Sequence, residues 1–539
     1  MTGVGPLDAM FLGGESREQP MHVGGLMLFE LPEGAGRDHV FPESSRDFVS
    51  RLYHELVAAP EVNPLFARRV RNRALDLGYW SWEQDDQIDL EYHVRLSALP
   101  RPGRFRELFE LTSRLHGTLL DRHRPLWEMH LIEGVEGRRF AVYSKIHHSM
   151  IDGVTALRLM QQTLTTDPTR TNMPATYSLP SGAGGDMPLH GAGGAGTAGD
   201  AVGGGAGWGM PPHGPGSARG AGSGTGPASA GAEWPAGGAG VGWGAGWGGA
   251  GVPGAVDLLA AVGRMPGRAL GSAVHGVGGA GRMLADLAGL PVAGLQGLLH
   301  STMPFQAPRT VFNQGVTGAR RFAAQSWPLE RLEKVRAITG ATLNDVLLAM
   351  CSGALRNYLL DLNALPDKAL TAMVPVNLRT KDSGPGGGNS LATLIADLAT
   401  DLADPEQRIR RIMASTAQAK SVLSGLTPLQ NLIVGALGFA VAGPGAVLPG
   451  VAGRTTPPYN IVISNVPGPT ESPLYWNGSR LLGLYPASIV MNGQALNISV
   501  TSYAHQLHVG LIGCRRTVPH LQRMLAHLET SLAELENIH

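Results

Sequence analysis

A stretch dominated by glycine, alanine, proline and serine, from about Ser181 to Ala255, interrupts this chain of 539 residues. It holds most of the glycine excess, since the chain has 75 glycines and an ordinary protein has about 7%. Such a composition cannot bury enough apolar surface to offset the conformational entropy lost on folding. We therefore interpret residues 181–255 as a flexible linker or insertion between two folded parts, residues 1–180 and 256–539.

Length and charge narrow the class of protein. A chain of this length exceeds what one hydrophobic core supports, so two domains are expected. Lysine plus arginine (43) equals aspartate plus glutamate (43), so we expect no nucleic-acid partner, and any membrane contact should be largely apolar. The two cysteines form no disulfide framework, and the N-terminus has no signal-peptide pattern, so we expect a cytoplasmic protein.

Hydrophobic periodicity predicts helices and strands in both parts of the chain. Residues 127–133 and 139–147 are predicted to form a hairpin of two strands, and a helical pattern begins after Gly153. Further helices are expected at 329–338 and 343–360, and further strands at 372–376, 459–464, 496–502 and 507–512. This mixture predicts an α/β or α+β fold.

Residues 429–453 carry no charge. Their length would span a bilayer, but Pro444 and Pro449 disfavour a simple transmembrane helix. The apolar stripe within 429–440 favours a buried helix, and a helix at a membrane interface is the alternative.

The segment from His147 to Gly153 carries the chemistry. Adjacent residues at the end of a strand point to opposite faces, so only one of His147 and His148 can meet a substrate. Imidazole suits general-base work because its pKa lies near neutral pH. Two adjacent histidines near an aspartate could instead be a metal site or ordinary surface residues. Zinc would need further ligands, and none is evident in the sequence.

Asp152 and Gly153 follow in the turn before the predicted helix. Gly153 is expected to permit a backbone conformation that bulkier residues resist. Asp152 could orient the histidine, but we favour an ion pair with an arginine that holds the loop, with Arg379 as the first candidate.

The pattern His-His-x-x-x-Asp-Gly resembles that of the CoA-dependent acyltransferase superfamily. Four further segments resemble the bacterial wax ester synthase/diacylglycerol acyltransferase family: Pro6–Phe11, Pro125–Glu128, Asn344–Ala349 and Ser464–Pro469. The resemblance covers the whole chain except the glycine-rich stretch.

This resemblance implies a fold of two chloramphenicol-acetyltransferase-like halves, a pseudo-dimer with a central substrate tunnel. Acyl-CoA would enter from one side and an alcohol from the other. His148 would deprotonate the acceptor hydroxyl, which attacks the thioester directly, so no cofactor, metal or covalent acyl-enzyme is required. His147 would be structural.

Other site residues follow from the same resemblance. Asn344, with Asp345 and Arg379, would support the transition state or the tunnel, although Asn344 could instead cap a helix. Residues expected to shape the tunnel are Pro125, Leu126, Trp127, Gly353, Ser464 and Asn465, with close helix packing as the alternative for Gly353.

The implied function is transfer of a long-chain acyl group from acyl-CoA to diacylglycerol, with fatty alcohols as alternative acceptors. We expect a monomer attached peripherally to the inner face of the membrane or to lipid droplets. One alternative is a condensation-type acyltransferase fed by a carrier protein, although the neutral charge balance does not favour a basic docking patch. The other is a catalytically silent lipid-binding protein.

Overall fold

The computed structural model describes residues 2–32, 43–58, 61–72, 80–180, 307–377, 391–424 and 457–538. All of them belong to one compact unit. The predictions made for the glycine-rich stretch, for Arg379 and for the helix within 429–440 lie outside the described residues.

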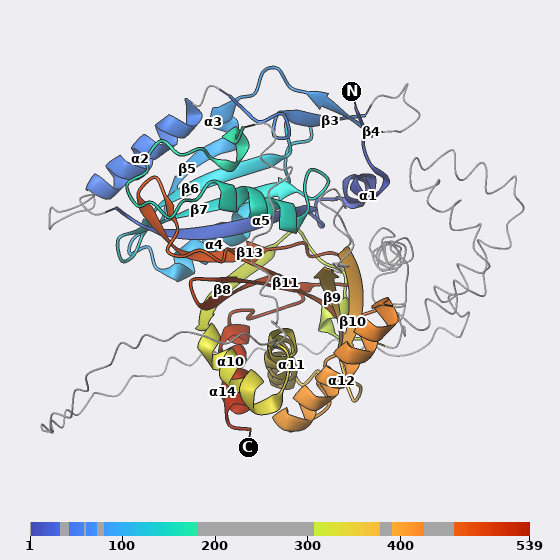
Figure 1. The fold of residues 1–539 in the computed structure, drawn as a ribbon. Helices are drawn as coiled ribbons and strands as arrows, with labels where there is room; N and C mark the ends of the chain where they lie inside the picture. Colours follow the sequence, from blue (N-terminus) through green and yellow to red (C-terminus); the bar gives the residue numbers. More distant parts are fainter. Residues whose placement is uncertain are drawn as a thin grey trace, which may run out of the picture. The chain divides into compact units, whose positions relative to one another are not determined.

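Two six-stranded sheets form the framework of this unit (Figure 1). The first sheet has the order β12 (Tyr475–Trp476), β13 (Ser479–Ala487), β2 (His22–Glu30), β7 (Arg139–His147), β6 (Trp127–Val135) and β5 (Val94–Ala98). The second has the order β10 (Leu391–Asp397), β9 (Thr371–Asn377), β11 (Ile461–Val466), β14 (Leu496–Tyr503), β15 (Gln506–Cys514) and β8 (Arg320–Pro328). A small sheet contains β1 (Thr2–Gly3), β4 (Trp80–Gln84) and β3 (Arg68–Asn72).

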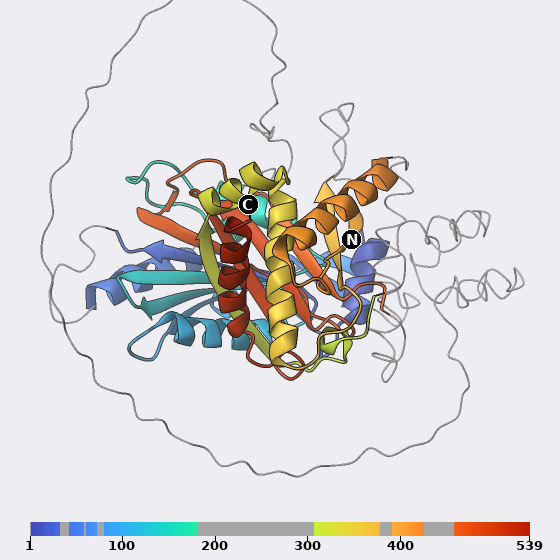
Figure 2. The same cartoon turned by 90° about the horizontal axis from the view of Figure 1, so that it is seen from below.

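Helices cover both main sheets. Four of them lie on the face of the second sheet that points away from the first, and they stand in front of its strands when seen from below (Figures 1 and 2): α10 (Leu329–Thr339), α11 (Leu343–Asp361), α12 (Pro405–Ser424) and α14 (Arg523–Glu536). The helices of the N-terminal part are α1 (Pro6–Gly14), α2 (Glu43–Val57), α3 (Leu90–His93), α4 (Phe105–His116) and α5 (Gly153–Gln162). Short 3-10 turns lie at Thr176–Ser178 and Val311–Asn313. The prediction of a mixed α/β protein is confirmed.

The hairpin of β6 and β7 forms where the sequence predicts it. Gly134 and Gly137 in its turn have φ angles of 79° and 77°, which glycine adopts without steric cost. The two faces of β7 serve different cores, because Ala141 and Tyr143 belong to one apolar cluster and Phe140 and Val142 to another.

The first sheet is not built from residues 1–180 alone. Strand β13, near the C-terminal end of the sequence, pairs antiparallel with β2, and Leu484 lies opposite Met27. Without β13, the outer edge of β2 would present unpaired N–H and C=O groups. Residues after the glycine-rich stretch therefore contribute to both sheets.

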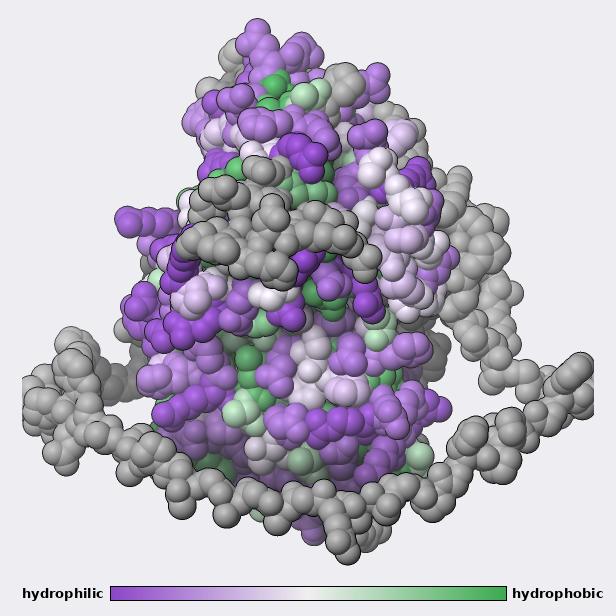
Figure 3. Space-filling view, turned by 90° about the vertical axis from the view of Figure 1, so that its left-hand side faces the viewer, coloured by the Kyte–Doolittle hydropathy of each residue, from purple (hydrophilic) through white to green (hydrophobic). Residues whose placement is uncertain are grey.

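Polar side chains dominate the described surface in the side view of Figure 3, and apolar residues appear there only in small separate areas. Among the described helices, none alone is long and apolar enough to cross a membrane. Helices α10 and α11 meet that criterion only as a pair, and the pair is bent by 102°.

Candidate active site

The two histidines at the end of β7 differ in exposure. The His147 side chain is fully buried, whereas His148 is partly exposed. Neighbouring segments hold both backbones, because the N–H of His147 donates to Leu126 O (2.9 Å) and the N–H of His148 donates to Met21 O (2.9 Å). His148 is therefore the histidine of this pair that a substrate can reach.

Buried polar groups of Ser149 and Glu15 contact the His147 ring. Its Nδ1 accepts the backbone N–H of Ser149 (3.2 Å) and lies 2.7 Å from Ser149 Oγ. Nδ1 therefore acts as an acceptor, which assigns the ring proton to Nε2. Nε2 lies 3.4 Å from Glu15 Oε1, close enough for electrostatic attraction but without hydrogen-bond alignment.

Glu15 is a residue that the sequence analysis missed. Its carboxylate is 3% exposed and accepts hydrogen bonds from Arg122 Nε (3.1 Å) and from the backbone N–H of Met21 (3.1 Å). Burial by itself would raise the pKa of Glu15, but His147, Met21 and Arg122 outweigh it and hold the pKa below its ordinary value. No motif in the sequence marks this residue.

The His148 ring lies in an apolar environment. It stacks on Phe11 with ring centroids 4.1 Å apart and an interplanar angle of 23°. Phe11 in turn belongs to a small cluster with Met21, Val23, Ile489 and Met491. Burial lowers the pKa of His148 to about 4, and the opposing effect of the Asp152 charge is smaller. The imidazole is therefore neutral at neutral pH and can accept a proton.

Asp152 caps helix α5. Its Oδ1 accepts the backbone N–H of Thr155 (2.7 Å), the usual bond of an N-cap aspartate. The neighbouring Arg68 of β3, which the sequence analysis did not find, also holds this loop. Its guanidinium lies over the Trp82 ring (4.4 Å) and donates to the carbonyl oxygen of Met150 (2.8 Å).

The prediction for Gly153 is wrong in its physical reason. Gly153 is not among the residues with positive φ, and a Cβ added there would meet no atom within 4 Å. Gly153 instead lines a cavity, and because it has no side chain it leaves this space open.

This cavity lies between the two main sheets and has an empty volume of about 900 Å³, including the part open to solvent. Ligand sites commonly span about 300–1,000 Å³. Most of the lining side chains are apolar or small. They come from β2, β6, β7, α5, β11 and β13, and they include Val23, Trp127, Ile146, Gly153, Ala156, Leu157, Met160, Ser464, Val466 and Leu484. His148 is not itself a lining residue, but Ile146 and Gly153 bracket the loop that carries it.

The Pro125–Glu128 segment supports this wall. Trp127 donates from Nε1 to Phe66 O (2.8 Å) and stacks on His93 and Tyr177. Leu126 is buried, and the carbonyl of Pro125 accepts the N–H of Trp127.

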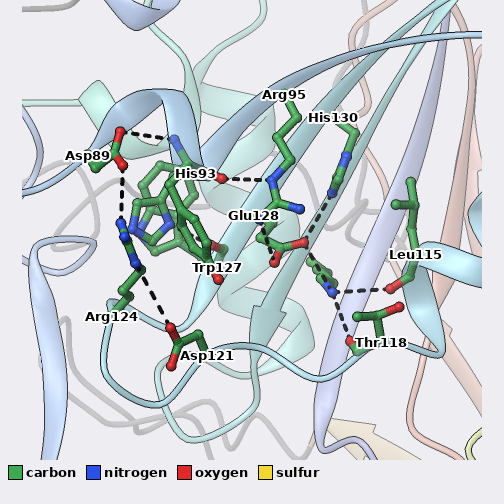
Figure 4. A network of polar contacts seen from close by, with 12 residues as sticks. Asp89, His93, Arg95, Leu115, Thr118, Asp121, Arg124, Trp127, Glu128 and His130 are labelled. Atoms are coloured by element: carbon green, nitrogen blue, oxygen red, sulfur yellow. Dashed lines mark hydrogen bonds and ion pairs between the residues drawn. The ribbon is translucent and has the colours of Figure 1, made fainter.

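Glu128 lies at the centre of a buried polar network beside the cavity (Figure 4). Its carboxylate contacts Lys145 (3.2 Å), His130 (3.2 Å) and Arg95 (3.4 Å). Burial favours the protonated carboxyl, but His130 and Lys145 outweigh it and lower the pKa of Glu128 to about 2. The ammonium of Lys145 also donates to the carbonyls of Leu115 (3.1 Å) and Thr118 (2.9 Å), which ties the end of α4 to the strand that carries the histidines.

The predicted residues of α11 do not reach the cavity wall. Thr342 caps this helix with Asp345 as its reciprocal partner, so the capping interpretation of Asn344 is wrong. The Asp345 carboxylate accepts from Thr342 Oγ1 (2.6 Å) and Thr416 Oγ1 (2.7 Å), which gives it a structural task. Asn344 is half-buried, and it is absent from the described residues that line the cavity.

Of the predicted tunnel residues Gly353, Ser464 and Asn465, only Ser464 lines the cavity. A Cβ on Gly353 would lie 2.1 Å from Ser531 Oγ of α14, so this glycine serves close helix packing and the tunnel prediction for it is wrong. Ser464 lines the cavity. Asn465 follows it in β11, opposite Val500 of β14, and alternation places it on the other face.

Comparison with known proteins identifies the family. The model described as wax ester synthase/diacylglycerol acyltransferase catalytic domain matches residues 4–207 and 250–347, and the WS/DGAT C-terminal domain matches residues 387–536. A Mycobacterium tuberculosis protein named "Probable diacyglycerol O-acyltransferase" is 44% identical, over 98% of each chain. The "O-acyltransferase WSD" of Acinetobacter baylyi is 35% identical, over 100% of this chain and 98% of the relative.

A solved structure supports the same assignment. The wax ester synthase/diacylglycerol acyltransferase from Marinobacter aquaeolei VT8 is 36% identical, with a TM-score of 0.69 and 99% of each chain covered. Fold, catalytic-domain model and full-length relatives therefore agree. The chain belongs to the wax ester synthase/diacylglycerol acyltransferase family and is an O-acyltransferase.

Proposed function

We propose that this O-acyltransferase transfers a long-chain acyl group from acyl-CoA to the hydroxyl of diacylglycerol, and also to fatty alcohols, with His148 as general base. The observation that carries the proposal is a partly exposed imidazole, neutral at neutral pH, on a loop whose neighbours Ile146 and Gly153 line an apolar cavity. A base of this kind contributes a rate factor of about 100 to 10,000.

In the proposed reaction the acceptor hydroxyl gives its proton to a ring nitrogen of His148. The hydroxyl oxygen attacks the thioester carbonyl carbon and forms a tetrahedral oxyanion. Its collapse breaks the C–S bond, and the departing sulfur of CoA takes the proton back from the imidazolium. The balance needs no redox step and no cofactor, and water must be kept from competing with the alcohol.

The cavity supplies the apolar surface for the alkyl chain. Leu157, Met160 and Leu484 form part of its wall, and the missing side chain of Gly153 leaves room beside the catalytic loop. Each buried methylene is worth about 0.8 kcal/mol, so a long chain gains much from such a wall.

Acceptor and location follow from the chemistry of the substrates. Diacylglycerol and fatty alcohols partition into lipid, so we propose peripheral attachment to the cytoplasmic face of the membrane or to lipid droplets. We propose that the enzyme acts as a monomer, because one chain supplies both Gly153 and Ser464 to the same cavity, from either side of the glycine-rich stretch.

The test measures release of free CoA from palmitoyl-CoA with either diacylglycerol or hexadecanol, with the product ester identified by chromatography. His148→Ala is expected to lose activity at least 100-fold and to keep its melting temperature. His123→Ala is the matched control, since that imidazole is 95% exposed. Full turnover by His148→Ala would refute the base, and turnover only with acyl groups bound to a carrier protein would refute acyl-CoA as donor.

A further inference from the structure

A second cleft opens where the N-terminal part meets the second sheet. It lies along α4, β8 and the segment that follows β15, with an empty volume of about 1170 Å³ including the part open to solvent. Its lining contains five guanidinium groups and one carboxylate, those of Arg106, Arg114, Arg320, Arg321, Arg515 and Glu110. A chain with no net charge thus concentrates positive charge at one place.

This charge is largely uncompensated. The Glu110 carboxylate is engaged by Arg106, one helical turn away (3.2 Å). Among the residues that the structure describes, no carboxylate forms an ion pair with Arg114, Arg321 or Arg515. These guanidinium groups therefore remain available to an external anion.

Arg320 adds a buried charge at the base of the cleft. The residue is 5% exposed, and its guanidinium donates to the backbone carbonyls of Glu18 (2.8 Å) and Val490 (3.1 Å) and to that of Thr317. Burial lowers the pKa of Arg320 to about 10, so the group stays protonated at neutral pH. Carbonyl oxygens solvate a cation but do not neutralise it, and buried charges are normally paired.

The carbonyl partners of Arg320 connect this cleft to the catalytic loop. Val490 lies between Ile489 and Met491, two members of the cluster that includes Phe11, on which His148 stacks. Glu18 lies three residues before Met21, whose carbonyl accepts the N–H of His148. Arg320 is therefore bonded to two segments that also contact the surroundings of His148.

We propose that this arginine cleft binds the phosphate groups of acyl-CoA, the 3′-phosphate and the diphosphate, and so marks the side from which the donor approaches. The inference rests on the proposed function. Guanidinium groups bind phosphate through paired, charge-assisted hydrogen bonds, and several of them at one place suit a ligand with more than one phosphate. In this proposal, the long and flexible pantetheine arm extends from the cleft towards the catalytic loop.

The test uses a double variant of the cleft, Arg321→Gln with Arg515→Gln, called the cleft variant. The matched control is the double variant Arg336→Gln with Arg410→Gln, whose arginines lie on the exposed surfaces of α10 and α12. Calorimetry with CoA alone needs no turnover, so it separates this inference from the catalytic proposal. The cleft variant is expected to bind CoA about tenfold more weakly or worse, with a smaller dependence on salt, and the control is expected to match wild type.

An acyl donor without phosphate groups provides a second test. The ratio of kcat/KM for palmitoyl-CoA to that for palmitoyl-N-acetylcysteamine should fall about tenfold in the cleft variant and stay constant in the control. An unchanged dissociation constant for CoA would overturn the inference. If the variant instead lost binding to phosphatidylglycerol vesicles while its affinity for CoA was unchanged, the cleft would be a site for lipid headgroups and the inference would also fail.

Discussion

At the residue scale, two adjacent histidines have different surroundings. The buried His147 contacts Ser149 and Glu15, whereas the partly exposed His148 contacts an aromatic ring. Alternation along a strand predicts this division. It does not predict Glu15, because that carboxylate approaches from a segment more than 130 residues away and no local pattern marks it.

Removal of the Glu15 charge should weaken the orientation of the catalytic loop. Glu15→Gln keeps the shape of the side chain but loses the attraction to His147 and Arg122. We expect kcat to fall roughly tenfold, a loss of about 1.4 kcal/mol, with KM for acyl-CoA nearly unchanged. Steady-state kinetics and the melting temperature check this. A fall in kcat that is accompanied by a clear fall in the melting temperature would point to a structural role only.

The pH dependence of activity reports the state of His148. A general base works only when deprotonated, and activity is lost as the pH falls through its pKa, which burial lowers to about 4. The rate constant kcat/KM should therefore stay flat from neutral pH down to about pH 5, and below about pH 4 it should fall tenfold per pH unit. An unchanged far-ultraviolet circular dichroism spectrum over the same pH range would exclude unfolding as the cause. An acid limb near pH 6.5 would contradict the apolar environment of the ring.

At the element scale, α11 shows how a glycine sets the distance between helices. The Cβ of an alanine at position 353 would lie 2.1 Å from Ser531 Oγ and 2.8 Å from Ser531 Cβ, so α11 and α14 would have to move apart. We expect Gly353→Ala to lower the free energy of unfolding by about 1–3 kcal/mol in urea titrations, and a second change, Ser531→Gly, to restore part of it. Gly153→Ala is the control, because nothing lies within 4 Å of its Cβ. Equal stability of Gly353→Ala and wild type would refute this packing.

The elements that the sequence predicts are those with a local pattern. Strands β6 and β7 alternate clearly, and the capping residues of α11 stand beside its apolar run. Strand β2 was missed because Gly24 and Gly25 interrupt its pattern, and its pairing with β13 joins residues about 450 positions apart. Within the site, the histidine loop could be predicted from its motif. Arg68 and Glu15 could not, because only the tertiary fold brings them to it.

At the scale of the whole molecule, the glycine-rich stretch separates two parts that depend on each other. Strand β13 completes the first sheet, and the side chains of Leu484 and Trp476 join the same apolar cluster as Met27 and Phe140. Residues 1–207 alone would expose the edge of β2 and one wall of the cavity to water. A fold divided in sequence at the insertion is therefore not divided in space.

Two fragments that break the chain at the segment unmatched by the catalytic-domain model, residues 1–207 and 250–539, test this dependence. Each fragment alone should be insoluble or should unfold without a cooperative transition, because its apolar faces lack their partner. Co-expressed, they should purify together and recover acyl transfer, because strands from both fragments build the first sheet. The control is a single chain in which residues 208–249 are deleted. It should keep both its activity and a single unfolding transition. A stable, cooperatively folded N-terminal fragment would show that the pairing of β13 is dispensable.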